Sequence, residues 1–287
     1  MKIDNYSVLM STYKTDNPKY LIESIDSILN QTVKTNDFVL VKDGKLTEEL
    51  DKVIDAYINK YPNLFNIIAL PKNVGLGKAL AIGITYCKNE YVARMDSDDY
   101  SFEDRISKEL NFLSKNPNVD IVGTQAIEFI DDVNNPVQYN SFPTTHIEIV
   151  KYAHSRNPYS HPSVIFKKSK VISAGNYQDA YLCEDYDLWI RLIQSNCICA
   201  NLDEYLFAVR VSADFYKRRS GLKYVKSINN LMKRNFSNGF FNFKDYIKNI
   251  IIRSVVYLMP NGLRKFIYSK FLRKGANSNG KNTAYSS

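Results

Sequence analysis

The chain has 287 residues, of which 45% are hydrophobic and 24% charged, and a formal net charge of +8 at pH 7. This composition is typical of a globular protein, long enough for one large domain or for a domain plus an extension. No apolar run approaches the ~20 residues that span a bilayer, and the N-terminus lacks the charged and apolar regions of a signal peptide. We therefore expect a protein that stays on the cytoplasmic side.

Strands and helices are predicted to alternate along the first 95 residues. Apolar runs indicate strands, and N-cap residues followed by apolar positions three and four apart indicate helices. The predicted strands cover residues 7–10, 37–41, 64–70 and 90–95, and the predicted helices cover residues 17–31, 47–61 and 77–87. This alternation favours an α/β fold whose parallel sheet is covered by helices on both faces.

Three loops follow predicted strands at the edge where parallel sheets bind ligands: residues 11–13, 42–44 and 96–99. Asp43 alone is more typical of a turn residue or a helix cap. Asp96, Asp98 and Asp99 are three like charges within four residues, and a hard divalent cation is their natural compensator. Mg²⁺ or Mn²⁺ held by one or two carboxylates keeps coordination positions for phosphates. We therefore expect a site for a metal and a diphosphate.

A glycine-rich segment at residues 73–79 is the other candidate phosphate loop. It lacks the glycine spacing and the Lys-Ser/Thr pair of a P-loop, and Leu80 breaks the GxGxxG pattern. A tight loop into the third helix is the preferred interpretation.

Five segments together resemble family 2 inverting glycosyltransferases of the GT-A fold, a Rossmann-like fold of nucleotide-diphospho-sugar transferases. They are SVLMSTYK, VLVKDG, NVGLGKALAIGI, VARMDSDD and YLCEDYDLWIRL, which begin at residues 7, 39, 73, 92 and 181. The resemblance covers residues 5–220, and the last two segments are the most specific. It is nearest to the enzymes of O-antigen and capsule assembly that add a single sugar.

The resemblance implies roles for particular residues. Tyr13 and Asp43 match positions that hold the uracil and ribose of a UDP-sugar, and Arg94 lies beside the nucleotide. Asp96-x-Asp98 matches the DXD metal motif, with Asp98 as the direct ligand. Asp185 matches the catalytic base. The nucleotide-sugar site is expected to comprise Thr12, Tyr13, Asp43, Lys78, Arg94, Asp96 and Arg219.

Two departures from the family pattern bear on function. Many members carry two aspartates before the glycine of the second loop, which contacts the ribose, but the first position here is Lys42. No QxxRW signature of the processive members follows Asp185, so we expect one sugar per acceptor.

The proposed base lies at the start of a predicted helix. Its apolar stripe, Leu188 to Ile193, shares a face with Asp185, which should therefore point toward the protein. A base and a Lewis-acid metal together meet the needs of inverting transfer. The alternative is that Glu184 and Asp185 only complement the helix dipole.

Candidate acceptor contacts lie near this helix. They are His161, Glu184 and Trp189. A lone histidine is more often structural, and a single tryptophan is slightly more often core. Arg218 and Arg219 are candidates for the diphosphate, with a solvated charge pair as the alternative.

Basic residues concentrate at the C-terminus. Residues 217–287 carry a net charge of +15, and the first 216 residues carry −7. Residues 244–274 interleave basic side chains with a long aliphatic run, which favours docking on anionic lipid over binding to nucleic acid. We therefore expect a domain at 1–220 and a basic, helical, membrane-associating extension at 221–287. Helices packed on the domain are the alternative for residues 222–259.

The four cysteines show no metal-binding spacing, so buried thiols are expected. Taken with the resemblance, the sequence predicts a peripheral enzyme on the cytoplasmic face of the inner membrane. It would transfer galactose or glucose from a UDP-hexose to an N-acetylhexosamine on undecaprenyl diphosphate, through a β-1,3 linkage and with Mn²⁺ or Mg²⁺. A lipid-docked nucleotide-sugar binding protein without catalysis and a metal-dependent nucleotidyltransferase are the alternatives.

Overall fold

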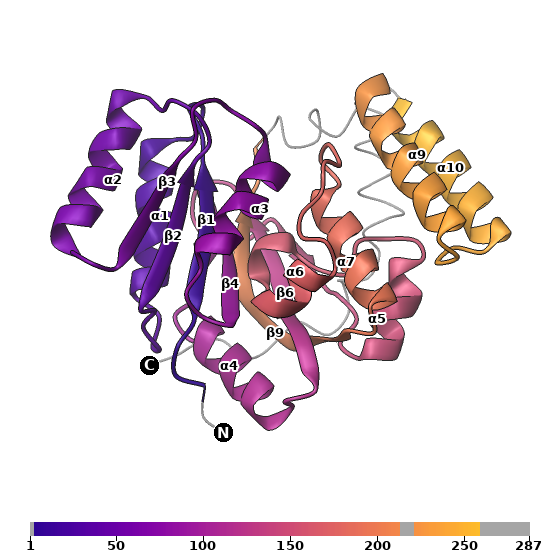
Figure 1. Ribbon diagram of the computed structural model, residues 1–287, viewed down its shortest axis with the longest axis horizontal. Coiled ribbons are helices and arrows are strands. Elements are labelled where there is room, and N and C mark those ends of the chain that lie inside the picture. Colours follow the sequence, from indigo (N-terminus) through magenta and orange to yellow (C-terminus); the bar gives the residue numbers. More distant parts are fainter. Residues whose placement is uncertain (1–2, 213–220, 259–287) are drawn as a thin grey trace.

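A computed structural model of the protein describes residues 3–212 and 221–258 (Figure 1). Its first half is a parallel four-stranded sheet in which β1 and β2 pair, β1 and β4 pair, and β2 and β3 pair. The strands are β1 (Ser7–Thr12), β2 (Asp37–Lys42), β3 (Phe65–Ala69) and β4 (Tyr91–Asp96), and the helices between them are α1 (Pro18–Leu29), α2 (Glu48–Lys60) and α3 (Leu76–Tyr86). These elements confirm the predicted alternation.

Local chemistry explains where the first two helices begin. Asn17 caps α1 by accepting a hydrogen bond from the Lys19 N–H, and Pro18 occupies the first helical position, where no N–H is needed. Thr47 caps α2 in the same way through the Leu50 N–H. Figure 1 shows α1 and α2 on one face of the parallel strands and α3 on the other, as expected for a sheet buried on both sides.

The second half extends the sheet with strands of mixed direction. The strand order is β3-β2-β1-β4-β8-β6-β9-β5, with β7 paired to β6. The added strands are β5 (Tyr100–Ser101), β6 (Val119–Phe129), β7 (Gln138–Asn140), β8 (Ile165–Lys167) and β9 (Ile198–Arg210). β8 runs antiparallel to both β4 and β6, while β6 and β9 are parallel. The parallel prediction therefore holds for the first four strands, and the complete sheet is mixed.

Two apolar layers cover the two faces of the sheet. One contains side chains of α1, α2 and α4 (Arg105–Lys115), and the other contains side chains of α3, α6 (Lys168–Ser173) and α7 (Glu184–Gln194). A Cβ atom at Gly83 in α3 would lie 2.6 Å from a Val41 methyl group and 2.7 Å from a Leu9 methyl group. The helix therefore approaches β1 and β2 more closely than any side chain at this position allows. All four cysteines are buried free thiols, as predicted.

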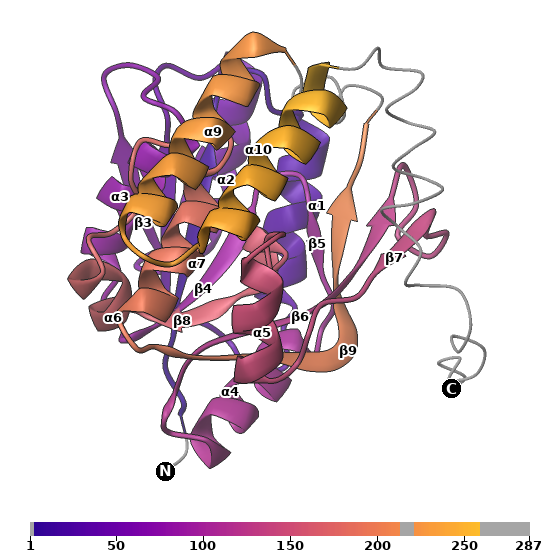
Figure 2. The same ribbon diagram turned by 90° about the vertical axis from the view of Figure 1, so that its right-hand side faces the viewer.

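Two C-terminal helices, α9 (Leu222–Ser237) and α10 (Phe243–Leu258), form a hairpin against α7 (Figure 2). Tyr186 and Ile190 of α7 share one apolar cluster with side chains of both helices. Arg234 of α9 also forms an ion pair with the buried Asp187. The remaining helices are α5 (His146–Ala153) and a 3₁₀ turn, η1 (His161–Ser163). Within the part of the chain described, no helix is both long and apolar enough to cross a membrane.

Candidate active site

The carboxyl ends of β1, β2 and β4 meet at one edge of the sheet, as expected. Ser11 is opposite Asp96, and Thr12 is opposite Lys42. Asp16 ties two of these loops together, because its Oδ2 accepts hydrogen bonds from the Thr12 hydroxyl at 2.9 Å and the Ser97 hydroxyl at 2.6 Å. Tyr13 follows β1 and is 38% exposed, so its ring is accessible at this edge.

Asp96, Asp98 and Asp99 form the acidic cluster that the sequence predicts. One carboxylate oxygen from each lies within 4.8 Å of those of the other two. Burial, together with the charges of Asp98 and Asp96, raises the pKa of Asp99 well above its ordinary value. Three oxygen donors at this separation suit a hard divalent cation, whose charge would relieve their repulsion. The donor set therefore fits a metal ion.

Arg210, at the end of β9, holds the acidic loop from behind. Its main-chain N–H donates to the Asp99 carboxylate at 2.8 Å, and its Nε donates to the Asp98 carbonyl oxygen at 2.9 Å. The guanidinium also forms an ion pair with Glu23 and stacks on the rings of Tyr20 and Phe129. No sequence motif marks this residue, because its hydrogen bonds to the acidic loop join positions more than 100 residues apart.

Arg94 is fully buried beneath the acidic loop. Its Nη1 forms an ion pair with Asp96, and its Nε and Nη2 have no hydrogen-bond partner among the described residues. Buried polar atoms without partners are costly, and the guanidinium retains hydrogen-bond donors beyond its ion pair with Asp96.

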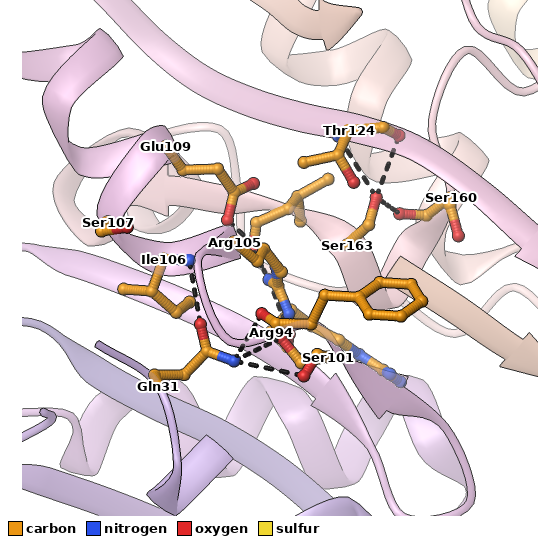
Figure 3. A network of polar contacts seen from close by, with 12 residues as sticks. Gln31, Arg94, Ser101, Arg105, Ile106, Ser107, Glu109, Thr124, Ser160 and Ser163 are labelled. Carbon is orange, nitrogen blue, oxygen red and sulfur yellow. Dashed lines mark hydrogen bonds and ion pairs between the residues drawn. The ribbon is translucent and has the colours of Figure 1, made fainter. Parts of the chain in front are cut away.

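A second buried arginine supports the strand that carries Arg94 (Figure 3). Arg105 donates from Nη2 to the carbonyl oxygens of Arg94 at 3.2 Å and Val164 at 3.3 Å, where β4 meets the segment before β8. Its Nε pairs with Glu109 at 3.0 Å. Burial raises the pKa of Glu109 to about 8 and lowers the pKa of Arg105. The network fixes the main chain directly under the acidic loop.

Asp43 and Lys78 engage protein groups at the same edge. The Asp43 carboxylate accepts hydrogen bonds from the Val74 N–H at 2.7 Å, the Gly75 N–H at 3.0 Å and the Asn73 amide at 3.0 Å. It therefore shapes the loop that enters α3, in agreement with the tight-loop interpretation of residues 73–79. Lys78 forms an exposed ion pair with Asp179 at 2.7 Å.

Glu184 and Asp185 open α7 close to the acidic loop. Glu184 is buried against the start of α3. A Cβ atom added at Gly77 would lie 3.0 Å from the Cβ atom of Glu184. Burial, with a contribution from the Asp185 charge, raises the pKa of Glu184 to about 7. The Asp96 charge also raises this pKa, and the Arg94 charge lowers it. The Asp185 carboxylate accepts a hydrogen bond from the Asn157 amide at 2.5 Å.

His161 and Trp189 lie behind this helix start. The His161 Nε2 contacts the Tyr177 hydroxyl at 3.0 Å, and its ring packs edge-on to Trp189. Burial and the nearby Arg94 charge lower the pKa of His161 well below its ordinary value, so the ring is neutral at pH 7. Trp189 is 1% exposed within the core layer that contains α7, in agreement with the core interpretation. Arg218 and Arg219 lie outside the described residues.

Comparisons with known proteins agree with this geometry. Residues 7–172 match the model of glycosyl transferase family 2. The chain is 36% identical over 269 residues to the UDP-Gal:alpha-D-GlcNAc-diphosphoundecaprenol beta-1,3-galactosyltransferase of Escherichia coli, with 94% of this chain and 97% of that protein aligned. It is also 36% identical over 273 residues to the amylovoran biosynthesis glycosyltransferase AmsE of Erwinia amylovora, with 94% and 100% aligned.

Two solved structures share the fold. The mannosyltransferase PcManGT of Pyrobaculum calidifontis, in complex with GDP-Man and Mn²⁺, has a TM-score of 0.64 at 15% identity, and covers 88% of this chain and 69% of its own. S. aureus TarS 1–349 in complex with UDP-GlcNAc has a TM-score of 0.66 at 15% identity, and covers 93% and 76%. Identities this low establish the fold alone, which is GT-A. The family model matches more than half of the chain, and two relatives aligned over nearly their whole length are 36% identical to it. The chain is therefore a glycosyltransferase and belongs to glycosyl transferase family 2.

Proposed function

We propose that the protein transfers one galactose or glucose, with inversion, from a UDP-sugar to an N-acetylhexosamine on undecaprenyl diphosphate, forming a β-1,3 linkage. The observation that carries this proposal is the meeting of an acidic cluster, a buried arginine and a pair of carboxylates on α7 at one edge of the sheet. The E. coli relative, whose name specifies UDP-Gal, a lipid-linked GlcNAc and a β-1,3 linkage, supports the choice of substrates. O-antigen or capsular polysaccharide assembly is the pathway class.

The donor is assigned to the loops after β1, β2 and β4. Tyr13 is proposed to stack on the uracil, with Thr12 beside it. Asp43 lies next to the ribose and, because its carboxylate is already bound by the 73–75 loop, acts mainly by shaping that loop. Arg94 has the unused donors that a phosphate needs. Lys78 and Arg219 complete the proposed nucleotide-sugar contacts.

Asp96 and Asp98 are proposed to hold Mn²⁺ or Mg²⁺. When bound, the ion would act as a Lewis acid on the diphosphate that leaves. Arg210 supports this loop, because it donates hydrogen bonds to the Asp98 carbonyl oxygen and to the Asp99 carboxylate.

Asp185 is proposed as the base. It takes the proton of the acceptor hydroxyl while that oxygen bonds to C1 of the sugar, and the bond from C1 to the diphosphate oxygen breaks with its electron pair on UDP. The acceptor hydroxyl attacks from the face opposite the leaving group, which inverts the anomeric centre. His161 and Glu184 are proposed to lie near the acceptor. Trp189 is assigned to packing beneath His161, since its ring is buried.

The outer face of α10 is proposed to dock on anionic lipid at the cytoplasmic face of the inner membrane. Its exposed apolar side chains are Phe243, Ile247, Ile251, Ile252 and Val255. Phe243, Ile247, Ile251 and Val255 are each four residues apart and therefore form one stripe, and α9 and α10 together carry a net charge of +6. The extension at 221–287 would thus bring the domain to its lipid-linked acceptor.

The assay measures UDP release from UDP-Gal and UDP-Glc with and without a synthetic lipid-diphosphate-linked GlcNAc. Acceptor-dependent release from one of them is expected. Asp185→Asn should keep donor affinity and lower kcat by roughly 10²-fold or more, because the nearly isosteric amide cannot take the proton. A near-wild-type kcat in this variant, or a change confined to the donor KM, would contradict the assignment. UDP-sugar binding without turnover would indicate a binding protein, and diphosphate release from UTP and a sugar phosphate would indicate a nucleotidyltransferase.

A further inference from the structure

Asn157, in the segment between α5 and η1, contacts the carboxylate at the start of α7. Its Nδ2 donates to the Asp185 Oδ2 at 2.5 Å, and its Oδ1 accepts the main-chain N–H of Tyr159 at 3.2 Å. The second bond orients the amide, because only the Oδ1 atom can accept from Tyr159 and the amino group must then face Asp185. Pro158 follows and restricts the backbone of Asn157 to extended conformations.

The Asp185 carboxylate is held at both oxygens. Oδ1 accepts the main-chain N–H of Tyr186 at 2.7 Å, while Oδ2 accepts from Asn157. Two donors on the two different oxygens restrain the plane of the carboxylate group. A carboxylate that must receive a proton along one direction benefits from this restraint.

Helix α10 holds the segment that leads to Asn157. The Asp245 carboxylate contacts the His154 Nδ1 at 2.9 Å, and Asn249 donates to the His154 carbonyl oxygen at 2.8 Å. Arg253 donates to the Ser155 carbonyl oxygen at 2.8 Å. Three consecutive turns of α10 therefore contact the residues two and three positions before Asn157, once at the His154 ring and twice at main-chain oxygens.

We propose that Asn157 is a positioning residue for Asp185 and that α10 keeps it in place. This inference rests on the proposed role of Asp185 as the base. It makes the C-terminal hairpin part of the catalytic geometry, since the helix assigned to lipid docking also fixes the donor that orients the base.

The test compares Asn157→Ala with the wild type in the UDP-release assay. Loss of a hydrogen bond to a charged group should lower kcat by about 10- to 100-fold and leave the donor KM unchanged. In an Asp185→Asn background the same substitution should cause no further loss of the residual rate, because residues that act as a unit are not additive. Asn36→Ala, which removes an exposed amide at the opposite edge of the sheet, is the matched control.

Asn157→Asp is a second variant that should fold, because Asp and Asn have nearly the same shape. It replaces the hydrogen-bond donor by a charge of the same sign as Asp185. It should lower kcat at least as far as Asn157→Ala. Wild-type kcat in either variant, or full additivity with Asp185→Asn, overturns the inference. Near-wild-type turnover of Asp185→Asn itself would instead overturn the proposed function.

The contribution of α10 is measured with Asn249→Ala, which removes the hydrogen bond to the His154 carbonyl oxygen. A smaller loss of kcat than in Asn157→Ala is expected, and Asn249→Ala should cause no further loss of kcat when it is added to Asn157→Ala. Additive losses in the double variant would overturn the assignment of α10 to this role.

Discussion

The ionisation of Glu184 is expected to make the free energy of unfolding depend on pH. Its carboxyl group is buried against α3, and burial with the Asp185 charge raises its pKa from 4.5 to about 7. A raised carboxyl pKa contributes stability that is fully present below about 4.5 and is lost as the pH rises through about 7. Because one pKa unit corresponds to about 1.4 kcal/mol, ionisation of Glu184 removes about 3 kcal/mol of folding free energy by pH 8. Glu184→Gln cannot ionise and escapes this loss.

Denaturant unfolding of the wild type and Glu184→Gln between pH 5 and pH 8 measures the effect. The variant should be more stable by under about 1 kcal/mol at pH 5 and by about 3 kcal/mol at pH 8. An Asp185→Asn background should reduce this difference, because the charge of Asp185 contributes to the raised pKa. Parallel stability profiles for the two proteins across this pH range would refute the reasoning.

Three further substitutions test other parts of the molecule. Asp98→Ala should abolish metal-dependent turnover and most UDP binding without lowering the thermal midpoint, since removal of one repelling carboxylate does not weaken the metal-free fold; full wild-type activity in EDTA would contradict this. Gly83→Ala should cost about 1–3 kcal/mol in denaturant unfolding, because its Cβ would contact Val41 and Leu9 at 2.6–2.7 Å. Ile251→Glu should reduce flotation with anionic vesicles, whereas Ile22→Glu on α1 should not; equal flotation of both, or flotation on neutral vesicles alone, would exclude the α10 stripe.

The sequence predicted those features that depend on neighbouring residues. The strands and helices through β4 follow from local periodicity and caps, such as Asn17 and Thr47. The acidic cluster is compact in sequence, so Asp96, Asp98 and Asp99 also lie together in space.

Contacts between distant segments escaped prediction. Asn157 reaches Asp185 from 28 residues away, Asp16 reaches Ser97 from 81, and Arg210 reaches Asp98 from 112. An isolated Asn, Asp or Arg has no pattern that distinguishes such a role from a turn or a solvated surface. The β6–β9 pairing also contains register shifts around Gln125, which alternation in sequence does not reveal.

The two interpretations of the C-terminal region, lipid docking and packing on the domain, are compatible because they concern opposite faces of one helix. Ile250 and Val256 of α10 pack in the cluster that covers Tyr186 of α7, whereas Ile251 and its stripe remain exposed. Truncation after Gly221 would expose the apolar face of α7 next to Asp185. A loss of activity or solubility in such a variant would therefore not test docking on lipid. Substitutions confined to the exposed stripe separate the two roles, because they leave the packed face and its contacts with His154 and Ser155 intact.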